Sequence, residues 1–195
     1  MKFDRDLFEE SFSLDHFPEW VCPTCNNGKL HVDKPFISQE LVRSKNAHTE
    51  EDWEPESKHE KFYGDLVCNS KKCGEKVTIA GRIEYWLDEE MEEANKERLL
   101  QKKFYPEYFY PYLKLFALPI DFPFELEEPI ETIFKLFWVD SSACANAIRI
   151  MVGEILTEQR INKTTKGRNK KRQYLNLHQR IENLKRKIKM WLKFF

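Results

Sequence analysis

The sequence predicts an α+β protein in which a small N-terminal region of antiparallel β-structure is followed by an α-helical bundle. Two pairs of closely spaced cysteines lie in the first half of the 195-residue chain. The short apolar segments beside these pairs are typical of strands. After Leu87, apolar residues recur at spacings of three and four, as they do on helices. The chain is therefore expected to have two structurally different parts.

The composition is that of a folded protein with segregated charge. Hydrophobic residues make up 41% of the chain and aromatic residues 14%, which allows a sizeable core and excludes disordered and fibrous classes. The formal net charge is only -1, but residues 160–195 contain thirteen Lys and Arg against one acid, Glu182. The rest of the chain is correspondingly acidic, so the basic segment is a candidate binding surface.

The cysteines form two candidate zinc knuckles. Cys22 and Cys25 have a C-x2-C spacing, and Cys68 and Cys73 have a C-x4-C spacing. A Gly follows the second cysteine of each pair within three residues, which suits a tight turn because Gly adopts positive φ without steric cost. Four thiolates would bind one structural Zn²⁺ per chain tetrahedrally and leave no open position.

Other interpretations of the cysteines stay open. Two disulfides are disfavoured in a chain without a secretory signal, and unligated buried thiols are the remaining alternative. Because the C-x4-C pair is the looser one, His31, His48 or His59 could replace one thiolate. Cys144 lies in a helical stretch of small residues, which predicts a core thiol without chemistry.

Strands around both cysteine pairs would make this region a zinc ribbon. They are expected at 20–21, 29–32, 62–67 and 76–85, with a bend or bulge at Gly81. The expected division of the chain is an N-terminal arm or helix at 1–19, the zinc ribbon at 20–86 with an acidic insertion at 44–60 that forms a loop or short helix, and an α-helical domain at 87–195 with a basic loop at 162–172.

The helical domain is expected to begin with a charged helix and an irregular aromatic connection. Residues 88–103 are free of Gly and Pro, which predicts a helix. Residues 104–111 are rich in aromatic residues and contain Pro106 and Pro111, which interrupt regular structure. Their rings could stack nucleic-acid bases. Core packing is favoured, since no basic residues alternate with the rings.

Two further helices are expected at 127–138 and 141–160. Pro129 suits the first turn of the first helix, and Asp140 or Ser141 can cap the second. Asn146 and Arg149 share one face of the second helix and could hold a phosphate or a carboxylate. A structural arginine bonded within the protein is the favoured alternative.

A basic loop leads into a basic helix in the last part of the chain. Residues 162–172 carry almost no apolar side chains, and apolar residues from Leu177 to Trp191 follow a 4-3-4-3 rhythm. This surface could bind nucleic-acid phosphates, or an acidic partner or the acidic rest of the chain could neutralise it. The candidate binding residues are Lys166, Arg168, Lys170, Lys171 and Arg172.

Several segments, taken in order, resemble a known family. They are the C-P-x-C pair at 22–25, the aromatic run at 105–111, F-W-V-D at 137–140, N-A-I-R at 146–149 and L-N-L-H-Q-R-I at 175–181. This order is similar to that of the proteins grouped as domain of unknown function 4145. The resemblance implies a HEPN-like helical domain and a role in prokaryotic or phage-related defence.

Some HEPN proteins are metal-independent ribonucleases that use an Arg and a His across a dimer interface. By the resemblance, Arg149 matches the family's helical Arg, although this chain has Gly153 where the family usually has Glu. Arg172 and His178 have the Arg-x(4–6)-His spacing of these nucleases, in a basic segment where chance also produces it. Arg149, Arg172 and His178 are therefore the candidate catalytic residues if the protein is an enzyme.

We expect a non-enzymatic zinc-binding interaction or assembly module with a protein partner or self-association. The alternatives are a HEPN-type ribonuclease and a nucleic-acid-binding protein that uses the basic C-terminal segment. Motifs of hydrolases, kinases and metalloproteases are missing, so no small-molecule substrate is expected. Residues 1–6 lack the order of a signal peptide and no apolar run would span a bilayer, which predicts a cytoplasmic protein without a membrane partner.

Overall fold

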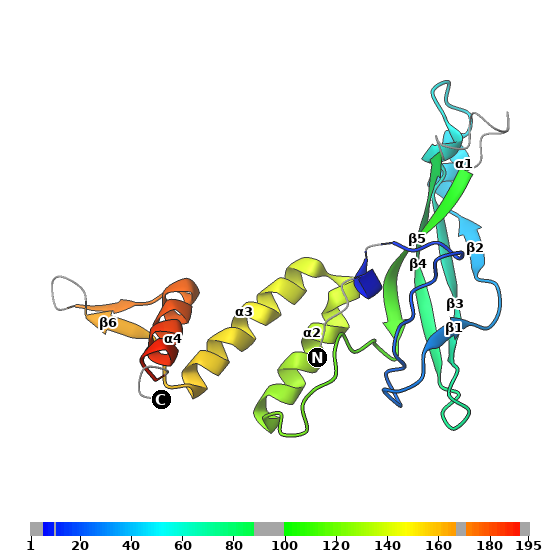
Figure 1. Ribbon diagram of the computed structural model, residues 1–195. Coiled ribbons are helices and arrows are strands. Elements are labelled where there is room, and N and C mark those ends of the chain that lie inside the picture. The colour runs from blue at the N-terminus through cyan, green and yellow to red at the C-terminus, as the bar shows by residue number, and fades with distance from the viewer. Residues whose placement is uncertain (1–5, 10, 88–99, 167–170, 192–195) are drawn as a thin grey trace. The chain divides into compact units, whose positions relative to one another are not determined.

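A computed structural model describes residues 6–9, 11–87, 100–166 and 171–191 of the chain. The chain divides into two compact units, unit 1 at 1–119 and unit 2 at 120–195. Figure 1 shows a sheet in unit 1 and helices in unit 2. Within the described residues, no helix is both long enough and apolar enough to cross a membrane.

Unit 1 is built on a curled antiparallel sheet of five strands (Figure 1). The long strands β3 (Glu60–Cys68), β4 (Lys76–Leu87) and β5 (Leu100–Tyr110) pair in this order. The free edge of β3 carries two short strands, β1 (Leu30–Val32) and β2 (Ile37–Glu40). The helix α1 (Val42–Ala47) and the 3-10 turns η1 (Asp6–Phe8) and η2 (Pro55–Ser57) complete the unit.

The sheet has one buried face and one exposed face, as β3 demonstrates. Side chains at alternating positions of a strand point to opposite faces. In β3 the residues Phe62 and Leu66 are buried, whereas Lys61, Tyr63 and Asp65 are exposed. The apolar alternation of the sequence therefore produces a sheet with its core on one side only.

The N-terminal segment crosses the buried face and completes the core. Phe12 stacks on Phe104 of β5 with ring centroids 5.4 Å apart. Trp20 meets Phe109 edge-on at 5.0 Å and donates from Nε1 to the carbonyl oxygen of Leu7 at 2.6 Å. Aromatic pairs in these arrangements add to the burial energy of the rings. Residues far apart in sequence thus form one aromatic core.

The bulge expected at Gly81 is confirmed. The pairing register of β4 and β5 shifts between Ala80 and Gly81. A Cβ at Gly81 would collide with the carbonyl oxygen of Tyr105 on β5. Only Gly allows the two strands to approach this closely.

In its described residues, unit 2 contains three helices and a β-hairpin. The helices are α2 (Glu127–Val139), which follows the turn η4 (Phe124–Leu126), α3 (Ser141–Glu158) and α4 (Leu177–Trp191). The strands β6 (Thr164–Lys166) and β7 (Arg172–Tyr174) pair antiparallel. The Asp140 side chain caps α3 by accepting a hydrogen bond from the N–H of Ala143 at 2.8 Å. The three helices agree with the sequence-based expectation.

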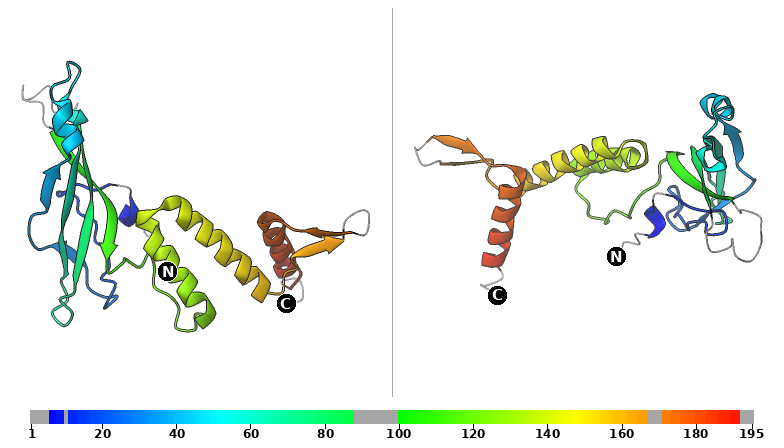
Figure 2. Two further views of the ribbon diagram at one scale, coloured as in Figure 1. Left: turned by 180° about the vertical axis from the view of Figure 1, so that it is seen from behind. Right: turned by 90° about the horizontal axis from the view of Figure 1, so that it is seen from above.

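The helices α2 and α4 contact opposite ends of α3 (Figure 2). Near the start of α3, the buried Cys144 thiol donates to the carbonyl oxygen of Ile133 in α2 at 3.7 Å. Near its end, the buried Arg180 of α4 donates to the carbonyl oxygen of Gly153 at 3.1 Å and to the hydroxyl of Thr157 at 3.0 Å. Cys144 is only 5% exposed, which confirms the expected core position, and this burial raises the pKa of its thiol.

The expected fold class, a zinc ribbon followed by an α-helical bundle, is wrong. Residues 100–110, expected as helix and irregular connection, form β5 and complete a sheet that continues from the cysteine-bearing strand. The helices of unit 2 form two successive pairs and not a bundle around one core. Pro106 argued against a strand in the sequence, because proline lacks the backbone N–H that a strand donates. β5 lies at a sheet edge, where this missing N–H is tolerated. Residues 88–99 of the expected helix lie outside the described residues.

Two segments expected without strands contain regular structure. The acidic insertion at 44–60 includes the end of α1, all of η2 and the first residue of β3, and β2 ends at Glu40, before α1 begins. The basic loop at 162–172 contains β6 and the start of β7, with 167–170 outside the described residues. These short polar strands have no apolar alternation, so the sequence carries no strand signal for them.

Candidate metal centre

Four cysteines converge at one end of the sheet in unit 1. Cys22 and Cys25 lie in the loop before β1, Cys68 is the last residue of β3, and Cys73 lies in the turn to β4. The antiparallel register brings the two segments together, because Leu30 of β1 is the Cα partner of Cys68. Strand pairing therefore joins the two knuckles predicted from the sequence.

The sulfur atoms have the separations of a tetrahedral site. The Sγ atoms of Cys22 and Cys73 are 3.8 Å apart, and those of Cys25 and Cys68 are 3.7 Å apart. All four sulfurs lie within 4.8 Å of one another, and none is in a disulfide. Sulfurs bound tetrahedrally at ~2.3 Å from one metal ion are ~3.8 Å apart. The four cysteines could therefore bind a metal ion with little movement.

Backbone N–H groups in both turns point at cysteine sulfurs. The N–H of Gly28 donates to Cys25 Sγ at 3.3 Å, and the N–H of Ser70 donates to Cys68 Sγ at 3.5 Å. Hydrogen bonds to the charged form of a group favour that form. Each turn thus stabilises the thiolates that a metal ion requires.

The two glycines of the turns have different roles. Gly74 adopts φ of +61°, as the sequence led us to expect. In the first turn the positive φ, +51°, belongs to Asn26 and not to Gly28. A Cβ at Gly28 would instead collide with the sulfur of Cys68. Gly28 is therefore needed for space, a requirement set by a residue on another strand.

The thiols differ in their tendency to ionise. Hydrogen bonds from the backbone N–H groups of Gly28 and Asn27 lower the pKa of Cys25 to about 6. Burial raises the pKa of Cys68 to about 12. Because metal ligands must be thiolates, binding releases the Cys68 proton, and the cation then offsets the cost of the buried charge.

The donor set suits an ion with a structural role. Four thiolates complete a tetrahedral coordination shell and leave no position for a substrate or an activated water. No histidine joins the four sulfurs within the described residues. His48, one of the alternative ligands, instead lies with its Nε2 2.7 Å from Glu40 Oε1.

A second polar cluster lies at the opposite end of β3. Glu60 is the first residue of that strand and is only 6% exposed. Its carboxylate lies 2.6 Å from the ammonium nitrogen of Lys58 and 3.7 Å from that of Lys102. Burial by itself would raise the pKa of Glu60, but Lys58, Tyr85 and Lys102 together lower it. The buried charge is thus compensated by its neighbours.

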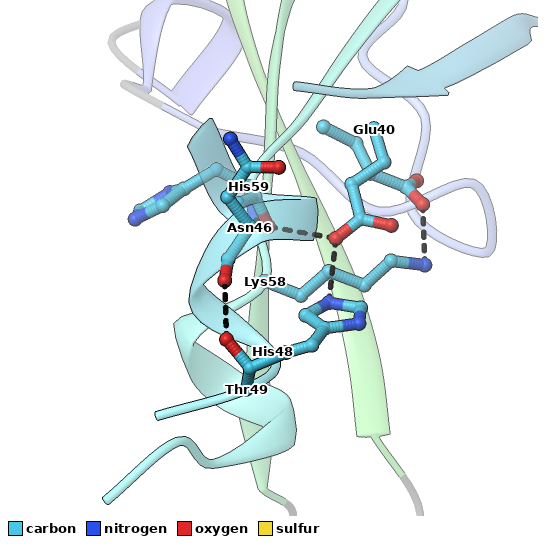
Figure 3. A network of polar contacts seen from close by, with 8 residues as sticks. Glu40, Asn46, His48, Thr49, Lys58 and His59 are labelled. Carbon is cyan, nitrogen blue, oxygen red and sulfur yellow. Dashed lines mark hydrogen bonds and ion pairs between the residues drawn. The ribbon is translucent and has the colours of Figure 1, made fainter. Parts of the chain in front are cut away.

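Figure 3 shows how the segment at 40–60 joins this cluster. Glu40 is the neighbour of Glu60 across the paired strands β2 and β3. Its Oε1 accepts a hydrogen bond from the Ser44 hydroxyl at 2.8 Å, and the same hydroxyl accepts one from the N–H of His59 at 3.0 Å. The hydrogen bond from Ser44 lowers the pKa of Glu40. Polar contacts therefore tie α1 to the sheet.

Comparison with known proteins adds a family. Residues 10–113 match the family described as domain of unknown function DUF8608. This match covers more than half of the chain and includes all four cysteines and all five strands of unit 1. The chain belongs to this family. No curated protein and no solved structure matches it.

The resemblance to domain of unknown function 4145 is wrong, because the family that matches is DUF8608. The DUF8608 region covers the sheet of unit 1, whereas the earlier resemblance rested on short segments, most of them in helices. A few residues per segment in matching order are too little to establish common descent. The HEPN-like domain and the defence role lose their basis, and the ribonuclease alternative remains an untested prediction.

The candidate catalytic residues lie outside the DUF8608 region, on three elements of unit 2. Arg149 is on α3, Arg172 begins β7, and His178 is in the first turn of α4. The guanidinium of Arg149 donates to Asn146 Oδ1 at 2.8 Å, so these two side chains contact each other on an exposed helix face. None of the three candidates hydrogen-bonds to another in the described part of the chain.

The candidate basic residues lie on the β-hairpin of unit 2. Lys166 and Arg172 are Cα partners in the pairing of β6 with β7. Lys171 is exposed beside them. Arg168 and Lys170 lie outside the described residues.

Sequence reasoning missed two sets of residues in the DUF8608 region. The first is the cluster around Glu60. The second is the placement of Tyr63 on one exposed face with Tyr108 and Tyr110; base stacking by the rings of 104–111 was considered and disfavoured, but Tyr63 was not connected with them. Each set joins residues from different strands, so no local motif marks it. The one available signal was an acidic residue, Glu60, at a position that continues the buried alternation of β3.

Proposed function

We propose that the protein is a non-enzymatic binding module, stabilised by one structural Zn²⁺, that binds nucleic acid through its C-terminal unit. A tetrahedral set of four sulfur ligands suits zinc or iron. Sulfur separations of 3.7 and 3.8 Å fit one ion with bonds to sulfur of ~2.3 Å, the length that zinc has. Reduced thiolates require a reducing compartment, which supports the cytoplasm.

The hairpin of β6 and β7 is the observation that carries the binding role. Lys166 and Arg172 stand directly opposite each other, and like charges in this position are unfavourable. Neither side chain has an acidic partner within the described residues. An anion lying against the hairpin would remove the repulsion and satisfy both cations.

The side chains of the hairpin are also mostly exposed to solvent. Five of its six described strand residues are exposed, and Tyr174 is 82% exposed. An isolated two-stranded hairpin is marginally stable in water. A two-stranded ribbon also fits the major groove of DNA. Phosphates of a nucleic acid are the partner that matches both its shape and its charge.

The surrounding segment contains almost no competing acid. Glu182 is the one acidic residue in 160–195, and its carboxylate already lies 2.7 Å from the ammonium of Lys185. Neutralisation from within this segment is therefore small. The charge is available to an external anion.

The test is fluorescence anisotropy with a labelled DNA duplex of two helical turns, over a range of salt concentrations. The change Lys166→Glu with Arg172→Glu should weaken binding to all sequences alike. It should also reduce the slope of log Kd against log salt by ~2. Failure of the wild-type protein to bind, or an unchanged slope in the variant, would contradict the proposed partner.

Arg43→Glu with Lys45→Glu is the matched control. Both residues are exposed on α1 of unit 1, and the double change alters the net charge by the same amount. The control variant should bind DNA like the wild type. Equal weakening in both variants would mean that only the overall charge of the protein matters.

A protein partner or self-association is a second candidate, favoured by the exposed apolar side chains of α3. Ile148 is 44% exposed and Ile150 is 65% exposed. Native mass spectrometry, read before and after acid denaturation, would report subunit number and bound metal together. A dimer that Ile150→Glu converts to monomer would support self-association, and a wild-type monomer would contradict it.

A further inference from the structure

The exposed face of the sheet in unit 1 carries aromatic residues that the core does not use. Trp86 is 51% exposed, Tyr63 46%, Tyr108 47% and Tyr110 67%. Side chains of this size and exposure on one face of a sheet form a platform on which planar groups can stack. The rings of β5 that point to the core, Phe104 and Phe109, are by contrast buried.

The strand register places two of these tyrosines on either side of a small residue. Tyr63 of β3 is the Cα partner of Ala80 of β4, and Ala80 is the Cα partner of Tyr108 of β5. Because neighbouring strands are ~4.8 Å apart, the two tyrosines stand ~10 Å apart across the sheet. Between them lies a shallow depression of about 290 Å³, whose lining includes Lys61, Tyr63, Ala80 and Tyr108.

Cations from neighbouring strands lie over two of the rings on this face. The guanidinium of Arg82 lies 4.2 Å from the ring centre of Tyr105, and the ammonium of Lys103 lies 4.7 Å from that of Trp86. Lys61 is exposed at the edge of the depression. Basic residues do not alternate with the rings along β5, but the register supplies them across the sheet.

The acidic residues on this face are already bonded. Glu84 and Glu107 both pair with Arg82, at 2.9 and 2.7 Å. Asp65 accepts a hydrogen bond from the Thr78 hydroxyl at 3.0 Å. Within the described residues, Lys61 and Lys103 have no acidic partner. Arg82 neutralises only one of its two carboxylates and Asp65 keeps its charge, so the face is not positive overall. The contacts that it offers an anionic ligand with planar rings are Lys61 and Lys103.

We infer that this face binds single-stranded nucleic acid, with unpaired bases stacked on Tyr63, Tyr108 and Tyr110 and phosphates near Lys61 and Lys103. Tyr108 and Tyr110 are two residues apart on one strand, or ~6.7 Å, which allows neighbouring bases of an extended strand to stack on both. The surface is separate from the hairpin of unit 2, so it goes beyond the proposed function.

The experiment compares a labelled oligo(dT) with an abasic oligonucleotide of the same length and charge, using the full chain. Stacking requires bases, whereas phosphate contacts do not. The wild type should bind oligo(dT) roughly 10-fold more tightly than the abasic strand. The change Tyr63→Ala with Tyr108→Ala should abolish this preference and leave abasic binding unchanged.

Two controls separate stacking from loss of fold. Tyr63→Phe with Tyr108→Phe retains both rings and should keep the preference. Phe124→Ala removes a ring that is 80% exposed but belongs to unit 2, and it should have no effect. All variants should unfold at the wild-type temperature, because the substituted side chains lie at the surface.

The outcomes distinguish the sheet face from the hairpin. Equal binding of both strands by the wild type would overturn the stacking surface. The stacking surface would also be overturned if the variant Tyr63→Ala with Tyr108→Ala keeps the preference for oligo(dT). If oligo(dT) binding is lost in the variant Lys166→Glu with Arg172→Glu but not in the tyrosine variant, the hairpin is the binding surface and the sheet face is overturned. A polyproline peptide bound by the wild type and released by the tyrosine changes, without base preference, would assign the face to a protein ligand.

Discussion

The two ends of β3 are stabilised by different chemistry. The strand begins at Glu60, in a cluster of charges supplied entirely by the protein, and ends at Cys68, in a set of thiols suited to an external ion. The nine-residue strand thus connects a self-sufficient end to an end whose thiols could bind a metal ion. The sheet is therefore expected to lose structure from the cysteine end first when metal is withheld.

Substitution of Cys68 should have the largest effect of the changes considered. Cys68→Ser removes one of the four candidate ligands from a buried position at the end of β3. Structural Zn²⁺ contributes ~10–16 kcal/mol in zinc-finger peptides, so the free energy of unfolding should fall by ~5 kcal/mol or more. Chemical denaturation measures the loss of stability, and metal analysis measures the loss of bound metal.

Hydrogen exchange sharpens the comparison between the ends. A chelator should expose the amides near Cys22 and Cys73 while those near Glu60 stay protected. Cys144→Ser serves as the control, because that thiol is buried in unit 2 and should leave the metal content unchanged. Uniform loss of protection along β3 would mean that the two ends are not independent.

Gly28→Ala should have the next largest effect, although it changes no ligand. Its Cβ would collide with the sulfur of Cys68. Overpacking of this kind costs ~1–3 kcal/mol, and weaker metal binding should add to the loss. Gly74→Ala meets no atom within 4 Å, so its cost should be only the ~1–2 kcal/mol of a left-handed backbone. Equal metal affinity in both variants would argue against the close contact.

Glu60→Gln tests the opposite end and should have a smaller effect. The substitution keeps the size of the side chain but leaves Lys58 and Lys102 without their carboxylate. Loss of a hydrogen bond to a charged group costs ~1.5–3 kcal/mol. Metal content should not change. The control Glu54→Gln, at an exposed position, should alter the stability by less than ~0.5 kcal/mol.

The smallest expected effect is a difference between wild type and Glu60→Gln in how their stability depends on pH. The folded pKa of Glu60 lies below its ordinary value of 4.5, so its carboxylate stabilises the fold above that pH. The stabilisation is lost as the pH falls through the lower folded pKa. The difference in stability between wild type and Glu60→Gln should therefore be constant near neutrality and shrink below pH 4.5.

Release of a bound metal ion in acid would destabilise both proteins alike, so it cancels in the difference between their stabilities. Denaturant unfolding of both proteins at several pH values, with the same metal supply, measures this difference in stability. A difference that grows as the pH falls would mean that the Glu60 carboxylate destabilises the folded state.

Local patterns predicted the individual elements well where one residue type dictates the geometry. Asp140 marks the start of α3 because its carboxylate can accept from the free N–H groups of the first turn. Gly81 marks the bulge because a side chain would block the approach of β5. The strand at 100–110 was missed, because Pro106 signals a break unless the strand is known to lie at an edge.

The cysteine cluster was predictable, whereas only part of the aromatic face, the rings of 104–111, was considered for stacking, for one physical reason. Metal ligands reveal themselves by spacing along the chain, since a turn must present two sulfurs to one ion. The cations beside the outward tyrosines come from other strands, so their proximity depends on register. Arg82 and Tyr105 are distant in sequence and stacked in space.

The sequence by itself determined the four candidate ligands, the three helices and the segregation of basic charge. Each of these depends on residues close together in the chain, where backbone geometry restricts what can form. Only the tertiary structure decided that the cysteines close one end of a five-stranded sheet, that Glu60 is buried among lysines, and that rings and cations share a face. These arrangements depend on which strands pair and in which register, because pairing places residues from distant segments a few ångströms apart.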